Sequence, residues 1–134
     1  MKTAAEITEG INQFTGTEQL HRFSVLFPKV LLSDGVKWLC ENADCFWLAD
    51  AIASHQPEAL KDPMLQDMQF WTLTTGEKLT KGRDRSATLI CERDTDDVAI
   101  KQKIEYTDFP LPSIKLYVGP SIEGCVLIYL PSEY

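Results

Sequence analysis

The two histidines of this sequence, His21 and His55, are its natural candidates for acid–base chemistry, because imidazole titrates near neutral pH. A histidine that acts as a general base needs a carboxylate to orient it and a nucleophile beside it. The candidates for these partners are Asp34 and Asp50 for the carboxylate and Ser24 and Ser54 for the hydroxyl. Their spacing along the chain brings no such set together. We therefore predict structural or surface roles for both histidines.

Several polar residues stand out because they interrupt apolar stretches or close a strand. They form the candidate site, which consists of Asp34, Lys37, Asp50, Gln102, Tyr106 and Asp108. Asp50 either faces solvent or pairs with a cation such as Lys37, because an unpaired buried charge is costly. Gln102 either holds a neighbouring loop or lines a pocket between sheet and helices. Tyr106 and Asp108 could belong to a functional cleft only if they faced Asp34 or Lys37.

Motifs for phosphate, metal or cofactor binding are missing from the sequence. Its glycines form no cluster before a helix, and it contains neither a G-x-S-x-G elbow nor H-E-x-x-H. Its cysteines lack the C-x-x-C pairs of zinc sites. The acidic run Asp94–Asp97 lacks the glycine and distal glutamate of an EF-hand and predicts a solvated turn. We expect no metal and no cofactor. The lack of these motifs favours a protein that is not an enzyme.

Charge disfavours nucleic acid and lipid as direct partners. The net charge is −7, from 20 acidic and 13 basic residues, whereas phosphate binding depends on Lys and Arg. An aromatic set could stack bases, but its helical and strand spacing in an acidic protein favours core packing; it comprises Trp38, Phe46, Trp47, Phe70 and Trp71. The acidity indicates solubility, or alternatively an acidic mimic that occupies a nucleic-acid-binding protein.

Helical spacing dominates the first half of the chain. Residues 3–14 predict a short helix, and a capping box at Thr15 and Glu18 predicts another over residues 17–24, before Pro28.

The main helical block covers residues 34–56, with Ser33 as its cap. A break at residues 42–44 lets Asp44 cap a second helix. Pro57 is expected to end that helix, and a short helical turn follows it.

The apolar spacing changes to two from Met68 onward, which predicts strands. The expected strands cover residues 68–75, 87–92, 98–106, 114–118 and 125–130, the last of them central in the sheet because both of its faces are apolar. A loop is expected over residues 76–85 and a hairpin turn at residues 94–97. The clearest alternation places Val98, Ile100, Gln102, Ile104 and Tyr106 on one face of a half-buried strand.

The order of these elements favours an α+β fold, with N-terminal helices packed on one face of a C-terminal antiparallel sheet of four to five strands. A length of 134 residues suits a single domain over residues 1–134. Residues 1–10 lack the apolar stretch of a signal peptide, and no run approaches the roughly 18 apolar residues of a membrane span. Free thiols suit a reducing compartment, so we expect a cytoplasmic protein without a membrane partner.

Five segments taken together resemble a bacterial family of small proteins classed as a domain of unknown function. They are Phe14–Glu18, Asp34–Leu39 (DGVKWL), Phe46–Ser54 (with WLADAIAS), Tyr106–Leu111 (YTDFPL) and Leu130–Tyr134 (LPSEY). The resemblance extends from about residue 14 to the end of the chain, and it implies no activity, substrate or cofactor. Leu32-Ser33 stands where we would expect Tyr-Thr in relatives, and its serine still suits a helix cap.

Three functions remain open. The first is a non-enzymatic binding or accessory domain, whose outer sheet face, or an edge near residues 114–118, meets a protein partner or a second copy of the chain. The second is a small-ligand enzyme of unrecognised class, with a site between helices and sheet. The third is the acidic mimic.

Overall fold

A seven-stranded sheet forms the centre of the protein in the part that the computed structural model describes, residues 2–78 and 85–134. The strand order is β1-β2-β7-β6-β3-β4-β5. The strands are β1 (His21–Arg22), β2 (Val30–Leu32), β3 (Gln69–Lys78), β4 (Arg85–Asp94), β5 (Asp97–Thr107), β6 (Ser113–Pro120) and β7 (Val126–Tyr129). The α+β class predicted from the sequence is confirmed.

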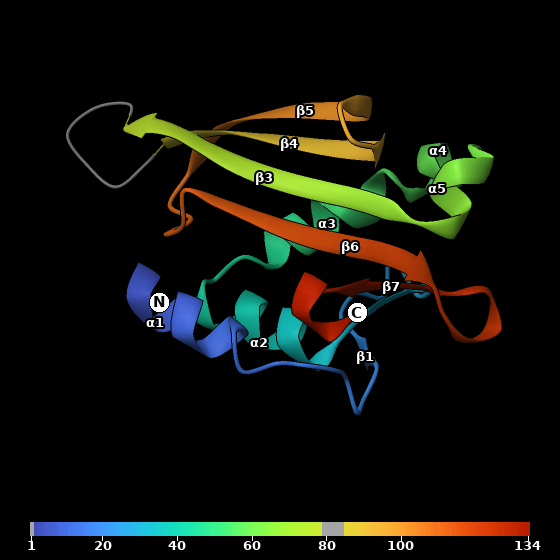
Figure 1. Ribbon diagram of the computed structural model, residues 1–134, viewed down its shortest axis with the longest axis horizontal. Coiled ribbons are helices and arrows are strands. Elements are labelled where there is room, and N and C mark those ends of the chain that lie inside the picture. The colour runs from blue at the N-terminus through green and yellow to red at the C-terminus, as the bar shows by residue number, and fades with distance from the viewer. Residues whose placement is uncertain (1, 79–84) are drawn as a thin grey trace.

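In the described residues, the helices leave one face of the central strands uncovered. They are α1 (Ala4–Ile11), α2 (Asp34–Asn42), α3 (Phe46–Ser54), α4 (Gln56–Ala59) and α5 (Pro63–Asp67), with two short 3-10 turns, η1 (Ile122–Gly124) and η2 (Pro131–Glu133). Figure 1 shows α3 crossing behind β3 and β6, and α4 and α5 beside the first residues of β3. We call the opposite face of β3, β4, β5 and β6 the open face.

The prediction of a purely antiparallel sheet of four to five strands is wrong in two respects: the sheet has seven strands, and two of them are parallel. β2 runs parallel to β7, with Val30 opposite Val126 and Leu32 opposite Ile128, and β1 pairs antiparallel with β2. The sheet is therefore mixed. Three consecutive apolar residues are too short a run to show a period, which is why the sequence did not predict β2. The two added strands make β7 an inner strand, as its apolar sequence predicted.

The helix predicted over residues 17–24 is wrong. The backbone N–H of Glu18 donates to Asp34 Oδ2 over 2.8 Å, and Thr17 Oγ1 accepts from the Asp34 N–H over 2.9 Å. These groups bind a distant residue, so they do not start a local helix. The segment then forms β1 instead.

The main helical block follows the prediction, apart from the cap of its second helix. Ser33 Oγ accepts from the Val36 N–H over 3.1 Å and caps α2. The chain breaks before α3 as expected, but Asp44 takes a left-handed conformation with φ of 54° and does not cap α3. Pro57 lies in the first turn of α4, and α5 was not predicted.

Four strands of the second half, β3 to β6, are longer than their alternation predicted, whereas β7 is shorter than the predicted residues 125–130. β3 continues through Gly76 to Lys78 and β4 begins at Arg85, so both enter the predicted loop; its residues 79–84 lie outside the described part of the chain. The hairpin turn at residues 94–97 is confirmed, with Asp94 opposite Asp97 and Asp96 at φ of 61°.

The register of β5 shifts near both of its ends, which changes the direction of two side chains. Cys91 pairs with Ile100 but the next residue, Glu92, pairs with Val98, and a second shift separates the pairs Ala87–Ile104 and Arg85–Thr107. Such bulges turn a side chain to the other face. Val98 and Tyr106 are therefore 46% and 71% exposed, although strict alternation predicted both on the apolar face.

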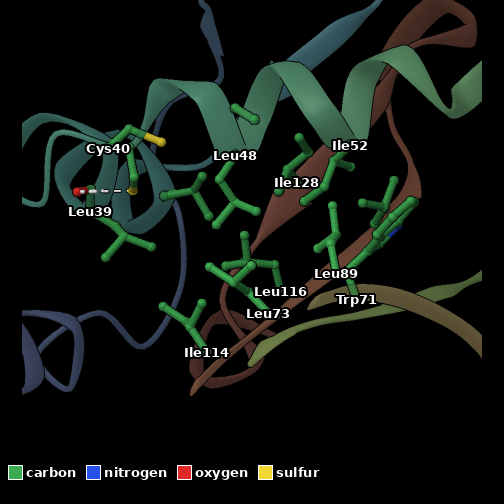
Figure 2. Packing of buried hydrophobic residues seen from close by; sticks show 14 of the residues in the cluster. Leu39, Cys40, Leu48, Ile52, Trp71, Leu73, Leu89, Ile114, Leu116 and Ile128 are labelled. Carbon is green, nitrogen blue, oxygen red and sulfur yellow. Dashed lines mark hydrogen bonds between the residues drawn. The ribbon is translucent and has the colours of Figure 1, made fainter. Parts of the chain in front are cut away.

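The core lies between α3 and the sheet. In Figure 2, Leu48 and Ile52 of α3 point toward Leu73, Leu116 and Trp71 of the sheet. All five side chains are at most 2% exposed. Of the five aromatic residues expected in the core, Trp71 is buried, and Trp38 and Trp47 are partly buried against the core. The expectation is wrong for Phe46, which is 39% exposed, and for Phe70, which is half-buried and does not pack against the core.

Candidate functional site

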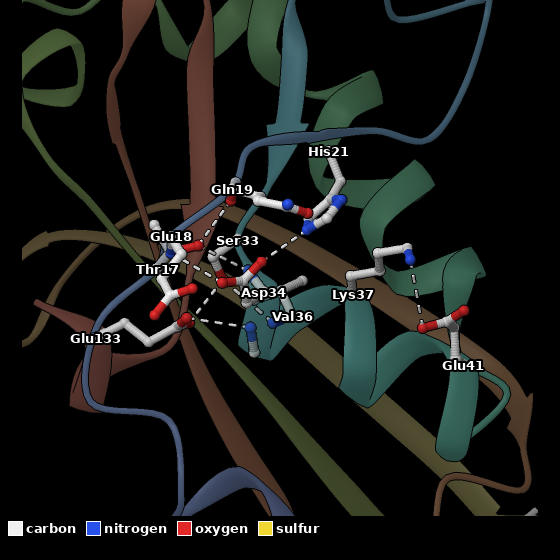
Figure 3. A network of polar contacts seen from close by, with 11 residues as sticks. Thr17, Glu18, Gln19, His21, Ser33, Asp34, Val36, Lys37, Glu41 and Glu133 are labelled. Carbon is white, nitrogen blue, oxygen red and sulfur yellow. Dashed lines mark hydrogen bonds and ion pairs between the residues drawn. The ribbon is translucent and has the colours of Figure 1, made fainter.

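Asp34, at the first turn of α2, is the centre of a polar network (Figure 3). Its Oδ1 lies 2.7 Å from His21 Nε2, and its Oδ2 accepts the Glu18 N–H. The hydrogen bond from His21, followed by that from the Glu18 backbone, lowers the pKa of Asp34 below its ordinary value. The network holds the segment before β1 against the start of α2.

Glu133 joins the C-terminal segment to the same helix end. Its Oε1 accepts from Ser33 Oγ over 2.6 Å and from the Leu130 N–H over 2.9 Å, while its Oε2 accepts from the Gly35 N–H over 3.1 Å. A carboxylate beside free amides at a helix N-terminus is electrostatically favourable. Glu133 is not among the site residues predicted from the sequence. Its only signal was its place in the LPSEY segment.

The His21–Asp34 pair supplies two of the three members of a catalytic triad. In the residues that the structure describes, no serine, threonine or cysteine side chain hydrogen-bonds to His21. The Asp34 and Glu133 carboxylates each accept at least two hydrogen bonds from the protein. This arrangement suits a clamp between chain segments more than it suits a reaction.

Lys37 and Asp50 do not form the ion pair that we considered. Lys37 Nζ lies 3.9 Å from Glu41 Oε1, one turn further along α2 (Figure 3). Asp50 is exposed on α3, and its carboxylate makes no hydrogen bond or ion pair within the described residues. Of the two interpretations of Asp50, the solvent-facing one agrees with the structure.

Gln102 fastens β5 to the end of α3. Its Oε1 lies 2.7 Å from His55 Nε2, and the His55 ring is 5.7 Å from the Trp71 ring. His55 is the C-cap residue of α3. Gln102 thus holds a neighbouring segment, which was the first of the two roles considered for it.

Tyr106 and Asp108 lie away from the other candidates. Tyr106 faces solvent, and Asp108 is exposed in the turn that follows β5. In that turn, Thr107 Oγ1 accepts the Phe109 N–H over 3.1 Å. The structure therefore brings only Asp34 and Lys37 near each other, on α2, and distributes the other four candidates over separate places.

A buried network of side-chain amides beneath the sheet was also not predicted from the sequence. Gln56 Nε2 donates to Gln69 Oε1 over 2.9 Å, and Gln69 Nε2 donates back to Gln56 Oε1 over 2.8 Å. Trp71 Nε1 donates to the same Gln69 oxygen over 2.8 Å. All three side chains are at most 5% exposed. Because the network is satisfied internally, it fixes α4 against β3 and offers no group to a ligand.

The open face carries a row of aromatic side chains. Phe70 of β3 lies opposite Tyr117 of β6, and Tyr117 lies opposite Tyr129 of β7. The ring centroids are 5.3 Å apart in the first pair and 5.8 Å in the second, both edge to face. Tyr134 stacks on Tyr129 at 6.4 Å. We call Phe70, Tyr117, Tyr129 and Tyr134 the aromatic row.

A hollow of about 250 Å³ lies on the open face beside the aromatic row. Its walls carry both charges and aromatic rings: Phe70, Trp71, Thr72, Glu92, Asp94, Thr95, Lys115 and Tyr117. None of the six residues of the sequence-derived candidate site lines it. The register places Glu92 and Lys115 on strands that flank β3 on opposite sides, so a bound group would meet an acid on one side and a base on the other.

No helix in residues 2–78 and 85–134 is long and apolar enough to cross a membrane. The same residues contain no group of three or more histidine, cysteine, aspartate or glutamate side chains that could hold a metal ion.

Comparison with known proteins places the chain in a family, but no activity is assigned to that family. Curated proteins gave no match to the chain, and neither did solved structures. A family model described as a family of unknown function (DUF6876) matches residues 5–134. The match covers the helices, the sheet and the C-terminal Glu133 clamp, and it agrees with the resemblance seen in the sequence. The chain therefore belongs to this family of unknown function.

Proposed function

We propose that this protein is a non-enzymatic binding domain that holds a protein partner on the open face of its sheet. The observation that carries this proposal is the aromatic row, which lies on the side of the sheet without helices. The solvated face of an antiparallel sheet ordinarily carries polar side chains. Tyrosine and other aromatic residues are enriched at protein interfaces, where they supply much of the binding energy.

The geometry of the row favours binding in a second way. The rings of Phe70, Tyr117 and Tyr129 already support one another in edge-to-face contacts. Side chains that are held in place lose less entropy when a partner covers them. Tyr117 and Phe70 also form part of the wall of the adjacent hollow, which offers a pocket for one anchoring side chain of the partner.

The enzyme alternative has less support. Catalysis needs several groups that converge on one pocket. Of the six candidate residues, Asp34 engages His21, Gln102 engages His55, and Tyr106 faces solvent. The acidic mimic also has less support on this face, because Lys101, Lys103 and Lys115 interrupt its acidic residues.

The test compares two members of the aromatic row with an exposed tyrosine outside it. Full-length tagged chain is expressed in its host as wild type, as the double variant Phe70→Ser/Tyr117→Ser, and as Tyr106→Ser, which removes an exposed tyrosine outside the row. We expect a protein retained by the wild type and by Tyr106→Ser, and lost by the double variant. With that protein purified, the double variant should raise Kd about tenfold or more.

Thermal unfolding of each variant separates binding from folding. The double variant must keep the circular dichroism spectrum of the wild type for its loss of binding to count. Equal retention of every partner by all three proteins, or an equal loss with Tyr106→Ser, would contradict the proposal. A retained nucleic acid that depends on Phe70 and Tyr117 would contradict it as well.

A further inference from the structure

The inner strand β6 has a partner on only one side over half of its length. β3 pairs with residues 113–118 of β6, whereas β7 pairs only with residues 117–120. In the described residues, no strand therefore pairs with Ser113–Leu116 on the side away from β3. Beyond Tyr129 the chain leaves the sheet and forms η2. This half of β6 is an edge inside the sheet.

A hollow of about 360 Å³ lies beside this half-edge. It is bounded by the end of α1, the start of β6 and η2, and its lining residues are Ile11, Asn12, Leu111, Ser113, Ile114, Lys115, Leu130, Pro131 and Ser132. The aliphatic members include Leu111, Ile114 and Leu130, which are 7%, 6% and 2% exposed. The exposed members, Asn12, Ser113, Lys115 and Ser132, are polar.

The two faces of the half-edge differ in chemistry. Ile114 belongs to the buried core, whereas its neighbours Ser113 and Lys115 are exposed on the open face. No acidic side chain within the described residues forms an ion pair with Lys115. A strand placed beside β6 would therefore meet an apolar surface on one face and an uncompensated positive charge on the other.

We propose that an extended segment of a partner protein adds to β6 at Ser113–Leu116 as a short strand. Its apolar side chains enter the hollow, and an acidic side chain on its other face pairs with Lys115. Exposed backbone groups of a strand edge give affinity to such an addition, and alternate side chains give specificity. Four residues span about 13 Å, which is enough for one short strand. The proposal specifies which kind of protein segment binds here, one with alternating apolar and acidic side chains. None of its contacts involves the aromatic row.

The probe is a blocked peptide of alternating valine and glutamate, about six residues long, and its partner in the comparison replaces glutamate with lysine. Binding is followed by nuclear magnetic resonance on the full-length chain. For the wild type, we expect the glutamate peptide to bind about tenfold more tightly than the lysine peptide. The amides of residues 113–116 should shift most and exchange more slowly with solvent. Lys115→Glu should reverse the preference between the two peptides.

Three controls make the result decisive. Lys101→Glu changes an exposed lysine of β5 that does not line the hollow, so it should keep the wild-type preference. Ser132→Trp should fill the hollow and abolish binding of both peptides. A backbone N-methylated glutamate peptide should fail to bind, because it cannot complete the ladder. An unchanged preference in Lys115→Glu, equal binding of the N-methylated peptide, or no binding at millimolar peptide would overturn the proposal.

The peptide experiment can succeed or fail independently of the proposed function of the open face. Phe70→Ser/Tyr117→Ser leaves every lining residue of the hollow in place, so it should still bind the glutamate peptide. If that double variant binds the peptide but loses its cellular partner, both proposals stand. If it keeps its cellular partner while the peptide fails to bind the wild type, the strand addition and the open-face proposal are both wrong.

Discussion

Two carboxylates, Asp34 of α2 itself and Glu133 of the C-terminal segment, hold other parts of the chain at the start of α2. Asp34 holds His21 and the Glu18 amide, and Glu133 holds Ser33 and the Gly35 amide. The helix cap at Ser33 could be predicted, because it depends on residues within one turn. The partners of both carboxylates could not, because Ser33 and Glu133 are separated by 100 positions and the sequence states no distance between them.

The contribution of the Asp34 hydrogen bonds to the free energy of unfolding should depend on pH. The pKa of Asp34 is lowered in the folded protein, so its stabilising contribution is complete above the unfolded value of about 3.9 and is lost as pH falls through the folded pKa. Asp34→Asn should therefore lower the free energy of unfolding at neutral pH, and the difference from wild type should shrink below about pH 4. Urea unfolding at several pH values measures it.

Asp50→Asn is the matched control for this measurement, because Asp50 is exposed and its carboxylate makes no hydrogen bond or ion pair in the described residues. Its free energy of unfolding should follow the wild type across the same pH range. A constant difference between Asp34→Asn and wild type down to pH 2 would contradict the clamp.

The contact between α1 and α2 depends on a glycine. A Cβ atom at Gly10 would lie 1.9 Å from the Trp38 ring, so the absence of a side chain lets α1 approach α2. In sequence terms, a glycine within the helix predicted over residues 3–14 only weakens that helix. Helix propensity is a local quantity, whereas the requirement for glycine comes from a side chain on another helix.

Gly10→Ala should destabilise the protein although alanine favours an isolated helix. Overpacking against the Trp38 ring should cost about 1–3 kcal/mol, which exceeds the gain of up to about 1 kcal/mol in helix propensity. The free energy of urea unfolding measures the net effect. Gly16→Ala is the control, since no atom lies within 4 Å of the added Cβ, and it should change stability far less. A stabilised Gly10→Ala variant would show that α1 does not pack on Trp38.

At the scale of the whole molecule, one core joins α3 to the sheet, and three of the four cysteines lie within it. Cys40, Cys45 and Cys91 are buried, whereas Cys125 is partly exposed. Burial raises the pKa of Cys91 to about 12, and the contact with Cys40 together with burial raises the pKa of Cys45. The thiolate is the reactive form, so these cysteines should be inert in the folded protein.

Thiol labelling should therefore report global unfolding. With an excess of an aromatic disulfide reagent at pH 8, we expect Cys125 to react first and the other three to react at the rate of unfolding. Mass spectrometry of the labelled peptides gives the order. Urea should accelerate the slow phase and leave the Cys125 phase nearly unchanged. Fast labelling of Cys91 without urea would show that β4 is exposed in the native protein.

The sequence by itself determined the α+β class, the helices α2 and α3 with the break between them, and most strands of the second half. These features depend on caps, periods and turns within a few residues. Only the tertiary structure decided the rest. β2 exists because β7 lies beside it, and the Val98 and Tyr106 side chains turn outward because β5 shifts its register against β4. The aromatic row and the half-edge of β6 likewise arise from pairings between strands that the chain order alone does not specify.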